Sequence, residues 1–277
     1  MITVKSRGEV EKMRRASAIV ADALEAVAAA VRPGVSTVEL DAIAYGVIHR
    51  AGAIPSFKGY SNQPGVPPFP ATICASVNDE LVHGIPSKRV LKEGDIISID
   101  VGAIWEGYHG DAAVTVPVGE ISPAARELLD VTQESLFAGI DAAHGGSRLG
   151  DISNAIERVL RAGGYGVVEG YGGHGVGRRL HEDPHIPNAG PAGKGPVLQP
   201  GVTLALEPMA NLGRAATKIR PDRWTVVTAD GKLCAHFEHT ICITPGEADI
   251  LTEFSPTLYR RIGGRVLGPA AAVSVGV

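Results

Sequence analysis

The sequence is poor in cysteine and in aromatic side chains. Only 5% of its 277 residues are aromatic, and its three cysteines are Cys74, Cys234 and Cys242. An odd number of cysteines without Cys-x-x-Cys spacing argues against a disulfide framework and against a structural zinc site. Reduced thiols instead fit a cytoplasmic protein.

The chain also lacks a long apolar run and an excess of positive charge. Its first residues, MITVKSRGEVEKMRR, are charged where a signal peptide has an apolar core, and Asp22 and Glu25 interrupt the apolar stretch that follows. The formal net charge is -4 and the pI is near 6.1, so overall charge does not support binding to nucleic acid or to an anionic membrane. We therefore expect a cytoplasmic protein with no membrane partner and no direct nucleic-acid partner.

What the chain does have is enough apolar sequence for a sizeable core, together with a weak internal repeat. Its length suits one large domain or two fused domains. Residues 34–52 align without gaps to residues 145–163, and a further helical pattern precedes each copy, at 9–31 and at 123–143. Strand patterns follow each copy. The repeat indicates either a duplicated helix-helix-strand half or a chance match between two amphipathic helices.

Each copy of the repeat carries the start signal of a helix. Ser36 and Glu39 form a capping-box pattern, for which Ser147 and Asp151 are a looser analogue. We therefore expect the two helices to begin at matching positions of the two copies.

Two aspartates interrupt a predicted hairpin at residues 96–118. Alternation of apolar and polar residues places Asp100 in the first strand and Asp111 in the second, on the less apolar faces. A turn at residues 105–106 or 106–107 would put the aspartates opposite or diagonal on a single face. Such a pair is destabilising unless it is exposed, protonated or neutralised.

The second half of the chain adds two acidic residues and a histidine. Glu207 lies in a short apolar run ended by a proline, and Glu238 lies in the second strand of a hairpin predicted around the Asp-Gly dipeptide at 230–231. His174 lies among glycines in GYGGHGVG, where the backbone can approach closely. Two pseudo-symmetric sheets would deliver these residues and the two aspartates to a shared cleft.

Charge balance indicates what such a cleft would need. Four carboxylates bring four negative charges, and each would cost several kcal/mol if it were buried unpaired. Two divalent cations would balance them, and shared carboxylates hold paired metals about 3.5 to 4 Å apart. An oxygen-rich ligand set with one histidine suits Mn, Fe, Co or Zn. Alternatively, the four acids are separate solvated strand ends or salt-bridge partners.

Five motifs, in this order along the chain, carry a resemblance to a known family. They are ICASVNDELVHGIP (73–86), IDVGAIWEGYHGDAAVT (99–115), GYGGHGVGRRLHEDP (170–184), LALEPM (204–209) and FEHT (237–240). Together they resemble methionine aminopeptidase of type I, over about residues 5 to 250. The resemblance implies the pita-bread fold, an α+β fold with two pseudo-symmetric halves around a central metal site.

The domain organisation follows from the same resemblance. We predict a single catalytic domain at 1–252, with halves at about 9–120 and 121–250. The segment 253–277 is predicted to be a flexible C-terminal tail because it is small, basic and low in complexity toward its end.

The resemblance also implies a reaction and a set of site residues. The implied ligands of two divalent metal ions are Asp100, Asp111, His174, Glu207 and Glu238. Glu207 would also accept and pass a proton. His83 and His181 correspond to the two histidines that contact the substrate and stabilise the tetrahedral intermediate. The implied reaction is hydrolytic removal of the initiator methionine by a metal-activated hydroxide.

A methionine pocket is implied at Tyr60, Phe69, Cys74 and Trp224. A thioether against aromatic edges is a favourable contact. The chain departs from the family pattern by about six extra, proline-rich residues between Tyr60 and Phe69. We expect a rigid excursion at the pocket rim, which is either a harmless surface loop or a determinant of specificity.

The resemblance implies partners as well. They are the N-terminal methionine of peptides and nascent chains, with a transient encounter with the ribosome, and the protein is expected to be a monomer. Two other functions remain open: an Xaa-Pro dipeptidase on the same fold, and a non-catalytic pita-bread binding module. The physiological metal stays open because affinity alone does not select it.

Overall fold

Helices and strands occur in two similar runs along the chain, each with two helices followed by strands. The computed structural model describes residues 1–61 and 65–263. The helices are α1 (Arg7–Ala30), α2 (Thr37–Arg50), α3 (Pro123–Asp141), α4 (Leu149–Ala162) and α5 (Pro256–Ile262). The strands of the first run are β1 (Ile54–Pro55), β2 (Ile73–Val77), β3 (Glu80–Val82), β4 (Ile96–Trp105) and β5 (Tyr108–Pro117). The later strands are β6 (Gly166–Val167), β7 (Gly172–Gly175), β8 (Glu182–Pro187), β9 (Thr203–Leu206), β10 (Met209–Asn211), β11 (Thr217–Ile219), β12 (Val226–Thr228), β13 (Cys234–His236), β14 (Glu238–Cys242) and β15 (Asp249–Ile250).

One large sheet joins the two runs. Its main path is β1-β4-β5-β14-β9-β7-β8, with β2 paired to β4 and β15 paired to β14. Strands from the first run therefore meet strands from the second at the antiparallel pair β5 and β14. Two three-stranded sheets, β13-β10-β6 and β11-β12-β3, complete the β structure of the described residues.

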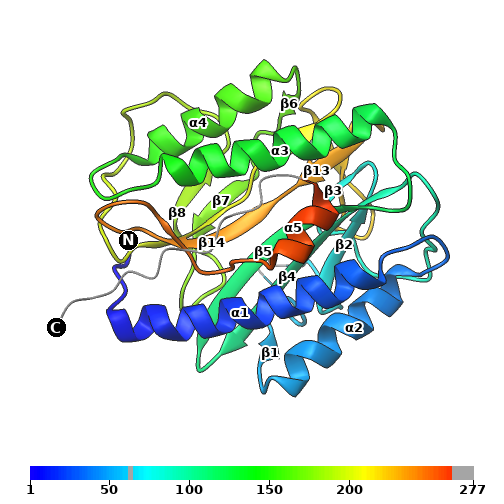
Figure 1. The fold of residues 1–277 in the computed structure, drawn as a ribbon, viewed down its shortest axis with the longest axis horizontal. Helices are drawn as coiled ribbons and strands as arrows, with labels where there is room; N and C mark the ends of the chain where they lie inside the picture. The colour runs from blue at the N-terminus through cyan, green and yellow to red at the C-terminus, as the bar shows by residue number, and fades with distance from the viewer. Residues whose placement is uncertain (62–64, 264–277) are drawn as a thin grey trace.

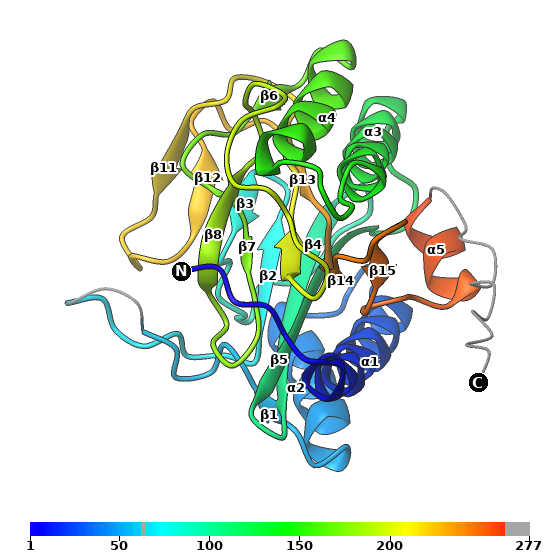
Figure 2. The ribbon, with the colours of Figure 1, turned by 90° about the vertical axis from the view of Figure 1, so that its left-hand side faces the viewer.

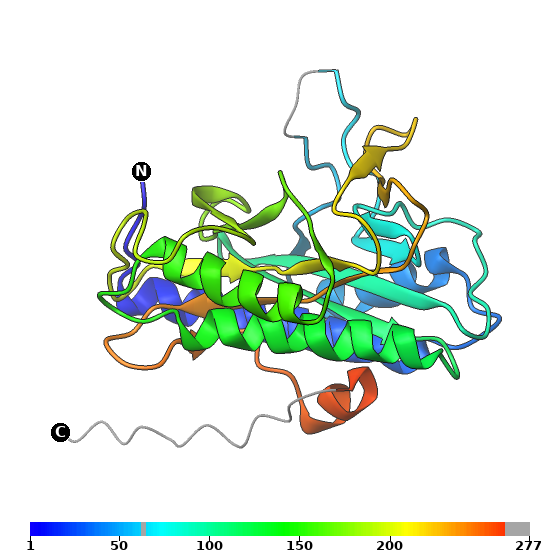
Figure 3. The same cartoon turned by 90° about the horizontal axis from the view of Figure 1, so that it is seen from above.

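The long helices cover one side of the large sheet (Figures 1 and 2). Helices α1 and α3 lie nearest the strands, with α2 packed against α1 and α4 packed against α3. Viewed from above, β11 and β12 project on the side away from α3 and α5 (Figure 3). None of the helices in the described part of the chain has the length and apolar character needed to cross a membrane.

The β4-β5 hairpin has the predicted alternation and the second of the two predicted turns. Trp105 pairs with Tyr108 across a two-residue turn, in which Glu106 and Gly107 have φ of 47° and 77°. Gly102 pairs with Asp111, so Asp100 and Asp111 are diagonal neighbours on the two strands. The hairpin prediction is therefore confirmed in its diagonal form.

One face of β5 packs against α1, and the opposite face carries Asp111. Ala112 and Val114 belong to the main apolar core with residues of α1. A Cβ at Gly110 would lie 2.6 Å from the backbone nitrogen of Ser17, so α1 approaches this strand too closely for any larger residue. Asp111, which lies between Gly110 and Ala112 in the sequence, points to the opposite face.

The repeated helices have the predicted arrangement, but the register of the repeat is shifted by one residue. Helices α2 and α4 begin 112 residues apart, at Thr37 and Leu149, whereas the gapless alignment requires 111. The capping box at Ser36 and Glu39 is confirmed. In the second copy the N-cap is Arg148, and Ser147 is not the capping residue.

The physical reason lies in the turn before α4. The hydroxyl of Ser147 donates to the backbone oxygen of His144 at 2.7 Å, which occupies it within the preceding turn. The backbone nitrogen of Arg148 donates to Asp151 Oδ2 at 2.7 Å instead. Asp151 therefore matches Glu39 once the register is moved by one residue.

The hairpin predicted around residues 230–231 is wrong. The turn exists, with the backbone nitrogen of Gly231 donating to Thr228 O at 3.4 Å. However, the strand before it, β12, pairs with β3 and β11, and the strand after it, β13, pairs with β10. The predicted second strand is also split between β13 and β14 at Phe237, whose backbone nitrogen donates to Pro208 O at 3.3 Å.

The first part of the C-terminal segment is packed, so the prediction of a flexible tail is wrong for residues 253–263. Tyr259 and Ile262 on α5 are buried. Arg261 Nη2 donates to Val31 O at 2.8 Å, and Arg126 Nη1 on α3 donates to Ile262 O at 3.1 Å. The rest of the predicted tail, 264–277, lies outside the described residues.

Gly110→Ala is expected to lower the free energy of unfolding by about 1 to 3 kcal/mol, because the added methyl group must push α1 away from β5. Urea unfolding followed by circular dichroism would measure the change. Gly8→Ala is the matched control, because no atom lies within 4 Å of a Cβ placed there. It should leave stability unchanged or raise it by up to about 1 kcal/mol. Equal stability of the Gly110→Ala variant and the parent would contradict the close packing.

Candidate metal centre and active site

One cavity of about 470 Å³ is lined by all eleven residues that the sequence predicts for the site. They are Tyr60, Phe69, Cys74, His83, Asp100, Asp111, His174, His181, Glu207, Trp224 and Glu238. They form an acidic group with His174 and an apolar group around Trp224. The two groups share a cavity large enough for a peptide's first side chain and its amide.

The acidic group comes from five consecutive strands of the large sheet. In the order β4-β5-β14-β9-β7, these strands carry Asp100, Asp111, Glu238, Glu207 and His174, with Glu207 directly after the end of β9. Because neighbouring strands lie less than 5 Å apart, one side chain from each strand forms a continuous row across the sheet. Both halves of the chain are needed to build this row.

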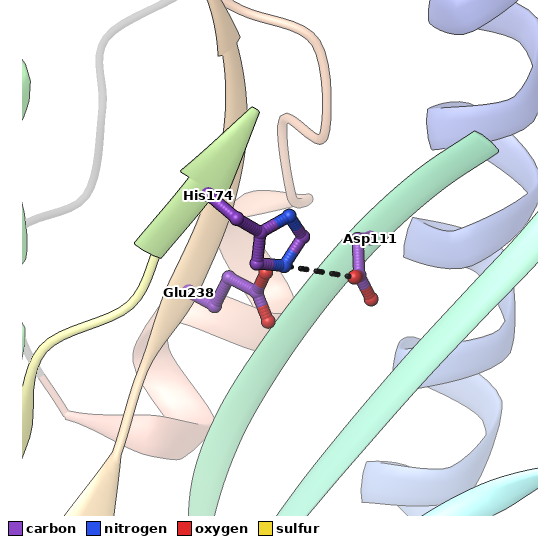
Figure 4. A group of neighbouring side chains, drawn as sticks. All are labelled: Asp111, His174 and Glu238. Carbon is purple, nitrogen blue, oxygen red and sulfur yellow. Dashed lines mark ion pairs between the residues drawn. The ribbon is translucent and has the colours of Figure 1, made fainter. Parts of the chain in front are cut away.

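The row converges most closely at Asp111, His174 and Glu238 (Figure 4). One potential ligand atom from each of these three residues lies within 4.8 Å of the other two. His174 Nε2 is 3.8 Å from Asp111 Oδ2 and 3.7 Å from Glu207 Oε1. These gaps are too long for hydrogen bonds, but a single cation could contact both atoms of either pair.

His174 is oriented to offer a lone pair to the acidic group. Its Nδ1 lies 2.9 Å from the backbone oxygen of Gly175. A carbonyl oxygen only accepts hydrogen bonds, so Nδ1 carries the proton and Nε2 is left bare toward the carboxylates. Burial lowers the pKa of this ring to about 3, which keeps it neutral at pH 7.

The carboxylates lack the protein partners that buried charges need. Asp100 Oδ1, Asp111 Oδ1 and Glu238 Oε1 are buried without a hydrogen-bond partner in the described structure. Among the described residues that line the cavity, Arg179 is the only Lys or Arg. No described Lys or Arg forms an ion pair with any of the four carboxylates. A donor set of this kind fits divalent cations.

Burial and mutual repulsion also shift the titration of these acids. Burial raises the pKa of Asp100 to about 7, with a further contribution from the charge of Glu207. Burial, followed by the neighbouring carboxylates, raises the pKa of Asp111 and of Glu238 well above the ordinary range. Burial does the same for the pKa of Glu207.

Two histidines face the acidic group from other segments. Burial lowers the pKa of His181 and lowers that of His83 to about 4, so both rings are neutral at pH 7. The hydroxyl of Tyr60 lies 2.6 Å from His181 Nδ1. When this hydroxyl donates, the proton of the His181 ring is on Nε2, where it is available to a bound molecule.

The segment after His181 is anchored by a buried ion pair. Lys5 Nζ lies 2.7 Å from Glu182 Oε2, and both side chains are more than nine-tenths buried. Thr3 Oγ1 donates to the same carboxylate oxygen at 2.9 Å. This pair fixes the backbone next to His181 against the N-terminal segment.

The apolar group forms a separate small core. Its buried members are Phe57, Phe69, Ala71, Cys74, Leu180 and Trp224, with Tyr60, Val66 and Ile85 packed against them. Phe69 and Trp224 meet edge to face, with ring centroids 5.3 Å apart. Of the side chains lining the cavity, Phe57, Leu180 and Tyr171 were not predicted, although Leu180 and Tyr171 lie inside the GYGGHGVGRRL motif.

The proline-rich insertion leaves Tyr60 at the cavity. The backbone nitrogen of Phe69 donates to Tyr60 O, and that of Gly59 donates to Phe69 O, each at 2.8 Å. These bonds close the base of the excursion, and Trp224 Nε1 donates to Pro67 O at 2.8 Å. Residues 62–64 of the excursion lie outside the described residues.

Three further buried histidines have different surroundings. His109 Nδ1 lies 2.9 Å from Ser56 Oγ. His239 Nδ1 lies 2.9 Å from Thr252 Oγ1, and its Nε2 lies 3.2 Å from Tyr259 OH. Both are buried and bonded to residues outside the carboxylate row. His236, by contrast, lies against Glu207.

Comparisons with known proteins show which family the chain resembles. The model of metallopeptidase family M24 matches residues 11–245. Methionine aminopeptidase 1 of Bacillus subtilis is 55% identical over 252 residues, which cover 91% of this chain and 99% of the relative. The crystal structure of methionine aminopeptidase from Thermotoga maritima has a TM-score of 0.88 and 46% identity, over 91% of this chain and 100% of that one.

A prolidase from Pyrococcus furiosus has the same fold, with a TM-score of 0.74, but at 23% identity and with only 66% of its length covered. That likeness shows the pita-bread architecture alone. Two findings decide the family. The M24 model matches most of the chain, and relatives with 50% to 55% identity are covered over 99% of their length. The chain belongs to metallopeptidase family M24 and, within it, to the type I methionine aminopeptidases.

Proposed function

We propose that this protein hydrolyses the peptide bond after an N-terminal methionine, using a metal centre held by Asp100, Asp111, His174, Glu207 and Glu238. The observation that carries the proposal is the row of these five residues on five adjacent strands, in one cavity with an apolar pocket. The printed names of the relatives agree with this reaction. An Xaa-Pro dipeptidase activity is not favoured, because the prolidase likeness supports the fold alone.

The metal centre is proposed to contain two divalent ions. Four ionised carboxylates without a Lys or Arg ion pair in the described part of the chain require about four positive charges, which two divalent ions would supply. When bound, such ions polarise a carbonyl group and make water a nucleophile at neutral pH. The oxygen-rich donors suit Mn, Fe, Co or Zn.

The remaining residues have roles that follow from their protonation. Glu207 is proposed to accept the proton of the attacking water, because its carboxylate lies at the cavity beside His174. His181, with its proton on Nε2, and His83 are proposed to donate hydrogen bonds to the substrate's carbonyl oxygen and amide region. Neutral rings can donate there without the cost of burying a further charge.

Recognition of methionine is assigned to Tyr60, Phe69, Cys74 and Trp224. These side chains, with Phe57 and Leu180, form the apolar wall that an unbranched thioether would fill. Burial raises the pKa of the Cys74 thiol, so it stays protonated and packs as a small apolar group.

Wider features are proposed on the family resemblance. The catalytic domain comprises residues 1–252, with halves at about 9–120 and 121–250. The protein acts as a cytoplasmic monomer on nascent chains, which implies a transient encounter with the ribosome. Sedimentation and ribosome-pelleting measurements would test these proposals directly.

Chelator-stripped protein is expected to release methionine from Met-Ala-Ser only after Mn, Fe, Co or Zn is added, because no Lys or Arg of the described residues forms an ion pair with the carboxylate row. Separate titrations with each metal, read by free methionine, would rank the ions. Ala-Pro is the matched control and should stay uncut. Cleavage of Ala-Pro alone would move the assignment to the dipeptidase branch, and no cleavage by folded, metal-loaded protein would favour a binding module.

His181→Ala is expected to lower kcat by about 100- to 1,000-fold, the usual cost of losing one preorganised donor. Tyr60→Phe removes only the bond to His181 Nδ1 and should cost about 5- to 10-fold. His185→Ala is the control: this histidine also lines the cavity, but it has no assigned role. Steady-state kinetics on Met-Ala-Ser would measure all three. Equal losses for His185→Ala and His181→Ala would contradict the role given to His181.

The stability that bound metal adds is expected to increase as the pH rises from about 6.5 to 8. In this range the metal-free folded protein still holds protons on the row of acids, since burial raises the pKa of Asp100 to about 7 and raises those of Asp111 and Glu238 well above their ordinary range. The unfolded chain holds none on these acids there, so they alone lower the free energy of unfolding by about 1 to 3 kcal/mol. The buried histidines, with their lowered pKa values, act in the opposite direction, because the unfolded chain still binds protons at histidine near pH 6.5. Comparing metal-loaded with metal-free protein at each pH removes this histidine contribution.

Urea unfolding at several pH values, with and without metal, would measure the effect. Bound metal keeps the acids ionised, so metal should stabilise the protein more at pH 8 than at pH 6.5. Equal stabilisation by metal at the two pH values would contradict the burial of unpaired carboxylates.

A further inference from the structure

A fourth buried imidazole lies behind the carboxylate row, outside the proposed set of ligands. We propose that His236 is a positioning residue, which donates Nε2–H to Glu207 Oε2 and so fixes the carboxylate that the metal centre and the proton transfer both need. This inference rests on the proposed function of the same site. It names a residue that neither touches the substrate nor belongs to the ligand set.

The Nε2 atom of His236 is a buried polar atom without a hydrogen-bond partner in the described structure. The residue is 2% exposed, and its Nε2 makes no complete hydrogen bond. The atom lies 3.4 Å from Glu207 Oε2. A buried nitrogen without a partner costs stability, so its position beside one carboxylate oxygen needs a reason.

The carboxylate of Glu207 lies between two imidazole rings. Its Oε1 is 3.7 Å from His174 Nε2, and its Oε2 is 3.4 Å from His236 Nε2. His174 presents a bare Nε2, because its proton is held on Nδ1 by Gly175 O. A proton on His236 Nε2 would therefore give the two oxygens of Glu207 different roles. Oε2 would accept a hydrogen bond from His236, and Oε1 would remain available on the side of the proposed metal ligand His174.

The backbone around His236 is anchored to the strands that carry the aspartates. The backbone nitrogen of His236 donates to Thr115 Oγ1 at 3.0 Å, and the same hydroxyl donates to His236 O at 2.8 Å. Thr115 Oγ1 also lies 2.9 Å from Ser98 Oγ. Thr115 is on the strand of Asp111, and Ser98 is on that of Asp100. The backbone that carries the ring is thus fixed by the first half of the chain, while Glu207 belongs to the second.

The strand pairing brings the two residues together. His236 on β13 pairs with Met209 on β10, two residues after Glu207. The break at Phe237 then lets β14 carry Glu238 into the row, so that His236 lies behind the row and Glu238 lies in it. A regular strand over 234–242 would have placed both side chains on one face.

The test compares two amide variants with different reach. The side-chain nitrogen of His236→Gln lies near the former Nε2 and can still donate to Glu207, whereas that of His236→Asn lies near the former Nδ1 and cannot. His239→Gln is the matched control, because His239 is equally buried but bonds Thr252 and Tyr259 away from the site. Calorimetric titration of the chelator-stripped full chain with Co²⁺ is the first readout, and kcat and KM on Met-Ala-Ser are the second.

His236→Asn is expected to weaken Co²⁺ binding by about 10- to 100-fold and to lower kcat more than it changes KM. His236→Gln should stay within about threefold of the parent in Co²⁺ affinity. His239→Gln should lower the midpoint of thermal unfolding while leaving Co²⁺ affinity unchanged. This pattern separates a hydrogen-bond donor from a residue needed only for packing.

Two results would overturn the proposal. One is parental Co²⁺ affinity in His236→Asn, and the other is equal weakening in His236→Gln and His236→Asn, which would point to shape or direct ligation. A parent protein that binds Co²⁺ without releasing methionine would refute the proposed function alone, since the affinity comparison among the variants remains readable.

Discussion

Four carboxylates from adjacent strands share one buried row, and no Lys or Arg of the described chain neutralises them. Most of the site's other features follow from this electrostatic cost. Burial of the row keeps its acids partly protonated and leaves several oxygens without hydrogen bonds, and the same burial keeps the nearby histidines neutral. A folded chain can retain such a row only if the rest of the structure is stable enough to offset it.

The opposite face of the same strands supplies that stability. Ala112 and Val114 pack under α1, and Gly110 lets the helix approach to van der Waals contact. Because side chains alternate along a strand, each strand can contribute an apolar residue to the core and an acidic residue to the cavity at neighbouring positions. The apolar core, which stabilises the fold, and the row of buried acids, which destabilises it, therefore lie on opposite faces of the same sheet.

Much of this arrangement could be predicted from the sequence, because the signals involved are local. Alternation places Asp100 and Asp111 diagonally, and Ser36 with Glu39 marks the start of α2. The gathering of the predicted residues in one cavity could be anticipated from the ordered motifs, although the order of the strands could not be read from alternation alone. The roles of those residues remain proposals.

The failures arose where distant partners decide the local structure. The turn at residues 230–231 forms, but its flanking strands pair elsewhere, since the backbone nitrogen of Cys234 donates to Asn78 O and that of Thr228 to Asp79 O. Ser147 loses the capping position because its hydroxyl is already bonded to His144 O. His236 carried no pattern that would link it to Glu207, because the break at Phe237 depends on Pro208 O.

The closed base of the excursion between Tyr60 and Phe69 has a consequence for how this protein could vary. Backbone bonds between Phe69 and both Gly59 and Tyr60 hold the two ends of the excursion together, whatever lies between them. The entropy of closing a flexible loop grows only slowly with its length. Residues could thus be gained or lost at this point during evolution at little energetic cost, while the wall of the cavity keeps its shape.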